Sequence, residues 1–288
     1  MVWGFGKDYQ QSDAEAAFFA SVEAGLTFID TAEVYGMGTS ERIVGECLRK
    51  CSKPVVIATK FMPFPTRLGR RTVNRALDAS LKRLGVSCVD LYQVHQPLPF
   101  IPIEMLMDIL ADAVQAGKIR TIGVSNYSEA QMRRAHAALV KRSLPLVSNQ
   151  VEYSLLQRAP EVNGVWKACQ ELNITLIAYS PLAKGLLSGK YTPDAPPPGV
   201  RRYMPQYRGE ALVRIQGVIQ ELTRIGEAHG GKTPAQVALN WLARQPIVLP
   251  IPGAKNAQHA AANAGAIGWD MSDDEANLLN QITLDWRA

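Results

Sequence analysis

Four polar residues stand at or just beyond the ends of short apolar segments in the first part of the chain: Asp30, Tyr35, Lys60 and His95. If these segments are strands of a barrel, their carboxyl ends open on one face, where such barrels carry their catalytic groups. A phenol donates a proton, a neighbouring ammonium group lowers its pKa, a carboxylate holds that ammonium group, and an imidazole orients a carbonyl. These four residue types therefore predict the reduction of an aldehyde or ketone, with Tyr35 as the general acid. Each residue alone is also explained as a capping or structural group.

The elements that would position these residues alternate along the chain. Short runs rich in Val, Ile and Leu predict seven buried strands, at 27–31, 55–60, 89–95, 119–124, 146–151, 175–180 and 247–251. Helical patterns between and after them begin near Ser12, Ser40, Thr72, Glu104, Ser128, 161, 210, 234, 256 and Ser272. Glu or Gln follows Ser12, Ser128 and Ser272 at the third position, which is a capping-box pattern.

Strand–helix–strand units with short loops predict right-handed crossovers and a parallel sheet. No G-x-G-x-x-G follows a predicted strand, which argues against a doubly wound nucleotide-binding sheet. We therefore expect an α/β fold, a (β/α)8 TIM barrel, in a single domain over residues 1–288.

Seven predicted strands leave such a barrel one strand short. The first barrel strand is expected to lie upstream of this sequence, to be replaced by residues 1–6, or to be lost. The resulting gap would lie between the strands at 27–31 and 247–251. The facing backbone groups would be unpaired, bound to water, or paired with residues 1–6 or with another chain.

Composition excludes several classes of function. The 288 residues are 47% hydrophobic, and 31 basic residues are interleaved with 26 acidic ones, so the net charge of +5 predicts no nucleic-acid partner. No apolar run reaches the roughly 18 residues that span a bilayer, so no membrane partner is expected. The four cysteines have no histidines at zinc spacing, so we predict no metal site and free thiols.

Seven motifs in a fixed order carry a family resemblance: FIDTAEVYG, IATK, DLYQVHQP, GVSNYS, SNQVEYSL, AYSPLAKGLLSGKY and IPGAKN. The chain resembles the aldo-keto reductases, and most closely the plant and cyanobacterial members. The resemblance implies a single TIM barrel and NADP(H) as the cofactor. It also implies that Asp30, Tyr35, Lys60 and His95 are the catalytic residues.

The resemblance also implies the residues that bind the cofactor. Ser125, Asn126 and Gln150 would hold the carboxamide, and the ring of Tyr179 would stack on the nicotinamide. The nicotinamide and pyrophosphate segment comprises Ser180, Pro181, Leu182, Lys184, Gly185 and Leu187. The adenosine-phosphate site comprises Pro252, Gly253, Lys255, Gln258, His259 and Asn263. Lys255 would face the 2′-phosphate and favour NADP over NAD.

Structural explanations of these residues remain open beside the functional ones. Ser125 and Asn126 would also serve as helix caps, Gln150 as a satisfied core amide, and Tyr179 as ordinary core packing. The Pro/Gly/Arg-rich stretch 192–209 predicts a mobile loop over the pyrophosphate.

Two other functions compete with carbonyl reduction. One is an NADP-binding regulatory or redox-sensing subunit with little turnover. The other is a TIM-barrel isomerase or aldolase in which Lys60 forms a Schiff base. We expect a small-molecule carbonyl substrate and a monomer or weak homo-oligomer. The expected location is the cytoplasm or the plastid stroma, since an incomplete N-terminus leaves room for a transit peptide.

Overall fold

The structure, a computed structural model, describes residues 10–287. Within them, seven strands are hydrogen-bonded in chain order. They are β1 (Phe28–Asp30), β2 (Val56–Phe61), β3 (Val89–Val94), β4 (Ile119–Ser125), β5 (Leu146–Glu152), β6 (Thr175–Tyr179) and β7 (Val248–Pro250). Each lies within one residue of its predicted limits, so the seven predicted strands are confirmed.

Helices fall between and after these strands. They are α1 (Gln11–Glu23), α2 (Thr39–Lys50), α3 (Arg70–Leu84), α4 (Ile103–Gln115), α5 (Glu129–Val140), α6 (Val165–Glu171), α7 (Gly209–Ala228), α8 (Pro234–Ala243), α9 (Ala257–Ala264) and α10 (Asp273–Ile282).

Two of the predicted capping boxes are confirmed. The Ser128 hydroxyl accepts from the backbone N–H of Gln131 at 3.4 Å, and the Ser272 hydroxyl accepts from that of Glu275 at 3.2 Å. In each case the Gln or Glu side chain accepts a hydrogen bond from the backbone N–H of the serine. Two backbone N–H groups of the first turn thus find acceptors.

The helix predicted to begin near 161 begins at Val165, after a short 3₁₀ turn at Ala159–Glu161. At three further helix starts the predicted first residue does not occupy the cap position. Ser12 lies inside α1, whose cap is Gln10, and Ser40 lies inside α2, whose cap is Gly38 in a left-handed conformation. The Ser40 hydroxyl is instead buried and shares a hydrogen bond with the Thr31 hydroxyl at 2.8 Å. Thr72 is the third residue of α3, and its hydroxyl donates to the carbonyl oxygen of Gly69 at 2.8 Å. Small hydroxyl residues stabilise a first turn from inside as well as from the cap position, and the sequence pattern does not distinguish the two.

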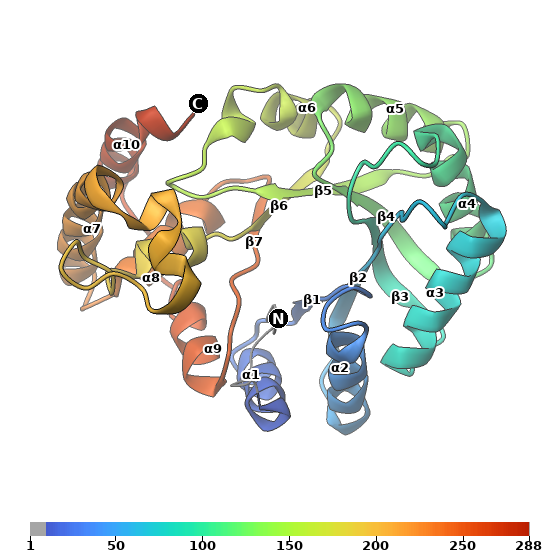
Figure 1. The fold of residues 1–288 in the computed structure, drawn as a ribbon, viewed down its shortest axis with the longest axis horizontal. Coiled ribbons are helices and arrows are strands. Elements are labelled where there is room, and N and C mark those ends of the chain that lie inside the picture. The colour runs from blue at the N-terminus through green and yellow to red at the C-terminus, as the bar shows by residue number, and fades with distance from the viewer. Residues whose placement is uncertain (1–9, 288) are drawn as a thin grey trace. The chain divides into compact units, whose positions relative to one another are not determined.

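The described residues form two compact units. The first comprises 10–151, 163–177 and 253–264. Its strands β1 to β5 pair in parallel, and Figure 1 shows α2, α3, α4 and α5 on the outer side of these strands. Helix α1 packs against α9, although the two helices are far apart in the sequence. This unit holds Asp30, Tyr35, Lys60 and His95.

The second unit comprises 152–162, 178–252 and 265–287 and contains α7, α8 and α10. In this unit the side chain of Arg158 is buried. It donates to the Asn280 carbonyl at 2.7 Å and to the Thr283 hydroxyl at 2.8 Å. The guanidinium also binds Glu161 and lies over the Trp241 ring. A buried cation is tolerated here because its donors all meet acceptors.

The stretch 192–209 includes two short 3₁₀ helices, Gly199–Tyr203 and Pro205–Tyr207. Tyr207 is buried, and its hydroxyl donates to the Lys184 carbonyl at 3.0 Å. This bond fixes one end of the stretch, and its mobility stays a prediction.

Strands β1 and β7 stand at the two ends of the strand order, and no ladder joins them within residues 10–287. A first barrel strand is absent from the same range. The predicted substitute, residues 1–6, lies outside the described residues. None of the described helices has the length and apolarity needed to cross a bilayer.

Candidate active site

The predicted catalytic residues lie at the carboxyl ends of adjacent strands. Asp30 is the last residue of β1, Lys60 lies one residue before the end of β2, and His95 directly follows β3. Tyr35 lies in the turn between β1 and α2 and is 7% exposed. The parallel register of β1, β2 and β3 therefore brings the four residues together, as predicted.

The Lys60 ammonium group is the centre of the site. It is fully buried and donates to Asp30 Oδ2, to the Thr31 carbonyl at 2.9 Å and to the Tyr35 hydroxyl at 3.4 Å. Burial alone would lower the pKa of Lys60, but Asp30 and Tyr35 outweigh it and raise the pKa above its ordinary value. Lys60 is therefore a fixed cation with its three donors engaged.

The Tyr35 phenol differs from the expectation in one respect. Burial raises the pKa of Tyr35, Asp30 raises it further, and Lys60 opposes both without reversing them. The predicted lowering of this pKa by Lys60 is therefore outweighed by desolvation. The phenol stays protonated at neutral pH, with a cation in place for the anion it would form.

The His95 imidazole is neutral at neutral pH. Burial, followed by the charge of Lys60, lowers the pKa of His95 to about 4. Its ring lies edge-on to the Tyr35 ring, with centroids 5.6 Å apart. The buried Nδ1 atom has no hydrogen-bond partner among residues 10–287. A neutral imidazole beside the phenol is suited to hydrogen-bond a carbonyl oxygen.

Two amides hold the other oxygen of Asp30. Oδ1 accepts from Gln150 Nε2 at 2.9 Å and from Gln93 Nε2 at 3.1 Å, and Gln150 Nε2 also lies 3.4 Å from Gln93 Oε1. Sequence reasoning missed Gln93. The signal was a polar residue inside an apolar strand, two positions before His95 and so on the same face of the strand.

The predicted carboxamide site is hydrogen-bonded to the predicted catalytic residues. The Ser125 hydroxyl donates to the Gln150 carbonyl at 2.9 Å, while Asn126 Nδ2 donates to Ser125 Oγ at 3.1 Å and to the His95 carbonyl at 3.3 Å. Asn126 has a φ of 61°, a left-handed conformation that Asn tolerates better than most residues. The cap of α5 is Ser128, so neither Ser125 nor Asn126 is needed for that role.

The predicted pyrophosphate segment has unusual backbone geometry. φ is positive at Ser180 (51°), Ala183 (47°), Lys184 (56°) and Gly185 (97°). Non-glycine residues in this region are strained, and such strain gathers at ligand-binding loops. Left-handed backbone also aims N–H groups into concave anion sites.

Side chains of this segment divide by exposure. Lys184 is exposed and pairs with Glu152 at 3.5 Å. Tyr179, Ser180 and Leu182 are half-buried, whereas Pro181 and Leu187 are buried.

The predicted adenosine-phosphate site lies before and within α9. Gly253, Lys255, Gln258 and His259 are exposed, and Pro252 is half-buried. The Asn256 side chain caps the helix by accepting from the His259 N–H at 2.9 Å. Asn263 Nδ2 donates to the Gly253 carbonyl at 3.3 Å, so this residue ties the loop to the helix. An exposed lysine beside a helix N-terminus suits a phosphate group.

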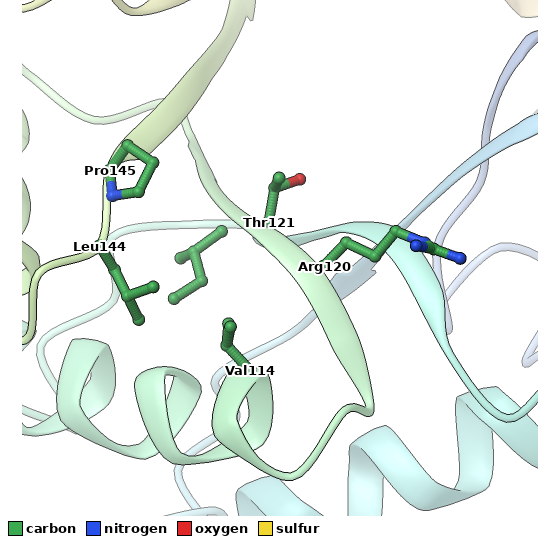
Figure 2. Close-up of a pocket in the computed structure, with 6 residues that line it drawn as sticks. Val114, Arg120, Thr121, Leu144 and Pro145 are labelled. Atoms are coloured by element: carbon green, nitrogen blue, oxygen red, sulfur yellow. The ribbon is translucent and has the colours of Figure 1, made fainter.

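A small hollow lies at the opposite end of the strands. Figure 2 shows it between the end of α4, the first half of β4 and the loop before β5. It is lined by Val114, Arg120, Thr121, Ile122, Leu144 and Pro145. Ser125 and Gln150 lie toward the other ends of β4 and β5, so this hollow is separate from the candidate site.

Comparison with known proteins decides the family. Residues 2–283 match the Aldo/keto reductase family. The chain belongs to the aldo/keto reductases. This membership confirms the predicted resemblance and the α/β, (β/α)8 barrel class.

Individual relatives agree with this family. The aldo-keto reductase yakc, NADP(+), of Schizosaccharomyces pombe is 38% identical over 90% of this chain and 79% of its own length. Pyridoxal reductase, chloroplastic, of Arabidopsis thaliana is 35% identical over 100% of this chain and 80% of its own. A crystal structure of an aldo-keto reductase from Klebsiella pneumoniae in complex with NADPH has a TM-score of 0.76 at 29% identity, over 95% of this chain and 85% of the other. This aldo/keto reductase is therefore an oxidoreductase by family.

Proposed function

We propose that this aldo/keto reductase reduces aldehydes or ketones to alcohols with NADPH, and that Tyr35 is the general acid. The observation that carries the proposal is the Lys60 ammonium group, buried and hydrogen-bonded to both Asp30 and the Tyr35 hydroxyl. Perturbed titratable groups gathered in this way mark catalytic sites more often than structural ones.

Proton transfer follows from this geometry. Tyr35 donates its phenolic proton to the carbonyl oxygen, and the resulting tyrosinate is stabilised by Lys60 Nζ, 3.4 Å from the oxygen. Asp30 keeps the cation in place, because its Oδ2 atom accepts from the same nitrogen. The neutral imidazole of His95 hydrogen-bonds the carbonyl oxygen and fixes the direction in which the carbonyl carbon faces. When bound, NADPH would supply the hydride that the carbonyl carbon accepts.

The residues present fit NADPH. Ser125 and Asn126 would hold the carboxamide, the strained segment around Lys184 and Gly185 the pyrophosphate, and Lys255 the 2′-phosphate. Gln150 already donates to Asp30, so only its oxygen would serve the carboxamide. NADP(+) in the name of the yeast relative and NADPH in the Klebsiella structure support this choice of cofactor.

One experiment separates this function from its competitors. NADPH binding is measured by fluorescence, and NADPH consumption is then followed with a panel of small aldehydes and ketones. Binding with consumption supports the reductase. NADPH binding without NADPH consumption in the presence of any carbonyl would favour a regulatory subunit. Conversion of a carbonyl compound in the absence of NADPH would favour an isomerase or aldolase.

A further inference from the structure

The buried amide of Gln93 belongs to the same layer of the sheet as Lys60. The two residues are partners in the parallel register of β2 and β3, and both are fully buried. Gln93 Nε2 donates to Asp30 Oδ1 at 3.1 Å, while Lys60 donates to Oδ2 of the same carboxylate. One neutral donor and one cation therefore hold opposite oxygens of Asp30.

The orientation of this amide is fixed from its other end. Gln93 Oε1 lies 3.4 Å from Gln150 Nε2, which itself donates to Asp30 Oδ1 at 2.9 Å. With Oε1 facing a donor, the Nε2 end of Gln93 must face the carboxylate. Neither amide carries charge, so they hold Asp30 without competing for the Lys60 ammonium group.

The neighbouring strand leaves room for this side chain. Gly123 of β4 is the register partner of Gln93, and a Cβ atom at Gly123 would lie 3.0 Å from Gln93 Cγ and 2.3 Å from Ser148 Oγ. The backbone of Gly123 is not left-handed, so the space it leaves, rather than its conformation, explains glycine here. Gly123 of β4 therefore leaves space for the long polar side chain of Gln93 on β3.

We propose that Gln93 is a positioning residue: it holds the Asp30 carboxylate in the orientation that keeps Lys60 Nζ within hydrogen-bond reach of the Tyr35 hydroxyl. In this role it acts through Asp30, whose Oδ1 atom accepts its hydrogen bond. The inference rests on the proposed carbonyl reduction. Loss of one donor to a buried carboxylate loosens that group, and the stabilisation of tyrosinate by Lys60 weakens with it.

Two variants of Gln93 test this role. Gln93→Met keeps the length of the side chain and removes both hydrogen bonds. Gln93→Glu keeps the shape, and its carboxyl group donates to Asp30 only when protonated. The matched control is Ser148→Ala, which removes a buried hydroxyl from the same layer that has no hydrogen-bond partner among residues 10–287.

Turnover gives the first readout. In Gln93→Met, kcat should fall about tenfold with KM for NADPH unchanged, because a hydrogen bond to a charged group is lost. In Gln93→Glu, kcat relative to the native protein should fall as pH rises, because the new carboxyl group loses its proton beside Asp30. Ser148→Ala should keep the native pH profile. Equal losses in both Gln93 variants at every pH would assign Gln93 a packing role only and overturn the proposal.

Titration of Tyr35 gives a readout that needs no turnover. Difference absorbance between each protein and its Tyr35→Phe counterpart isolates this phenol. Its midpoint should move to higher pH in Gln93→Met, because Lys60 opposes the effect of burial less well. An unchanged midpoint overturns the positioning role. If the native protein reduces no carbonyl, carbonyl reduction fails as the function while this titration still decides the role of Gln93. If Gln93→Met does not fold, Gln93→Leu, which also removes both hydrogen bonds without adding a charge, carries both measurements.

Discussion

The predicted catalytic cluster and the predicted pyrophosphate segment hold their lysines in opposite ways. Lys60 is fully buried and donates to three oxygens, whereas the Lys184 side chain is 50% exposed and meets one carboxylate at 3.5 Å. The first arrangement fixes a charge where water is excluded, which strengthens its effect on a neighbouring phenol. The second leaves a charge accessible to an anion that must arrive and leave. Under the proposed function, the buried lysine serves proton transfer and the exposed lysine serves cofactor binding, and single substitutions in each region test this contrast.

Removal of the Tyr35 hydroxyl should have the largest effect. Tyr35→Phe should lower carbonyl reduction by about 10²–10⁴-fold, the usual contribution of a general acid. NADPH affinity, measured by fluorescence titration, should stay near native because the phenol acts on the substrate. Tyr92→Phe is the control, since that buried hydroxyl has no partner among residues 10–287. Native turnover in Tyr35→Phe would remove this residue from the mechanism.

The same substitution in the two regions should have unequal effects on stability. Lys60→Met leaves the buried carboxylate of Asp30 without its cation and should lower the free energy of unfolding by about 3 kcal/mol. Lys184→Met breaks an exposed pair and should cost less than about 1 kcal/mol. Urea unfolding of both variants measures the contrast. Equal decreases in the free energy of unfolding would mean that burial of Lys60 adds nothing to its contribution to stability.

The neutral imidazole of His95 predicts a loss of stability in acid. Its pKa is about 4 in the folded protein and about 6.5 in an unfolded chain, so unfolding takes up a proton between these values. The contribution of neutral His95 to the free energy of unfolding is fully present above pH 6.5 and is lost as pH falls toward 4. Between pH 7 and pH 5 it amounts to about 2 kcal/mol. Urea unfolding at both pH values should show a smaller acid loss in His95→Asn; parallel losses would contradict the lowered pKa.

Loss of the exposed lysine before α9 should have the smallest effect. Lys255→Ala should reduce the preference for NADPH over NADH by about tenfold, because one charge-assisted contact to the 2′-phosphate is removed. The dissociation constants of both cofactors are compared at fixed salt, with Lys167→Ala as an exposed control. A native protein that binds the two cofactors equally would refute the assignment of Lys255.

Much of the fold was predictable because strand patterns repeat along the chain. The predicted strands ended within one residue of the observed ones. Gly25 and Gly85 follow α1 and α3 with positive φ, where glycine is favoured. Helix starts were less predictable. Ser12, Ser40 and Thr72 all lie within first turns. The buried hydrogen bond with Thr31 accounts for Ser40, and the bond to the Gly69 carbonyl accounts for Thr72.

The sequence predicted that four residues meet in space, but it did not predict how burial and charge balance at Tyr35; the catalytic roles of the four stay a prediction. Asp30, Lys60, Tyr35 and His95 were recognisable because strand ends converge. The direction of the Tyr35 pKa was not, because it depends on how completely the phenol is buried. Gln93 and its bonds across β1, β3 and β5 were also hidden, since pairing between strands is not written in local sequence.

The pairing of α1 with α9 has a consequence for synthesis. Translation proceeds at about 5–20 residues per second, so α9 is completed roughly 10–50 s after α1. Until then the nascent chain carries α1 without the helix that packs on it in the finished protein. Ala14, Phe18 and Val22, all buried at the end, are the apolar residues of α1 that a ribosome-associated chaperone would meet during that interval.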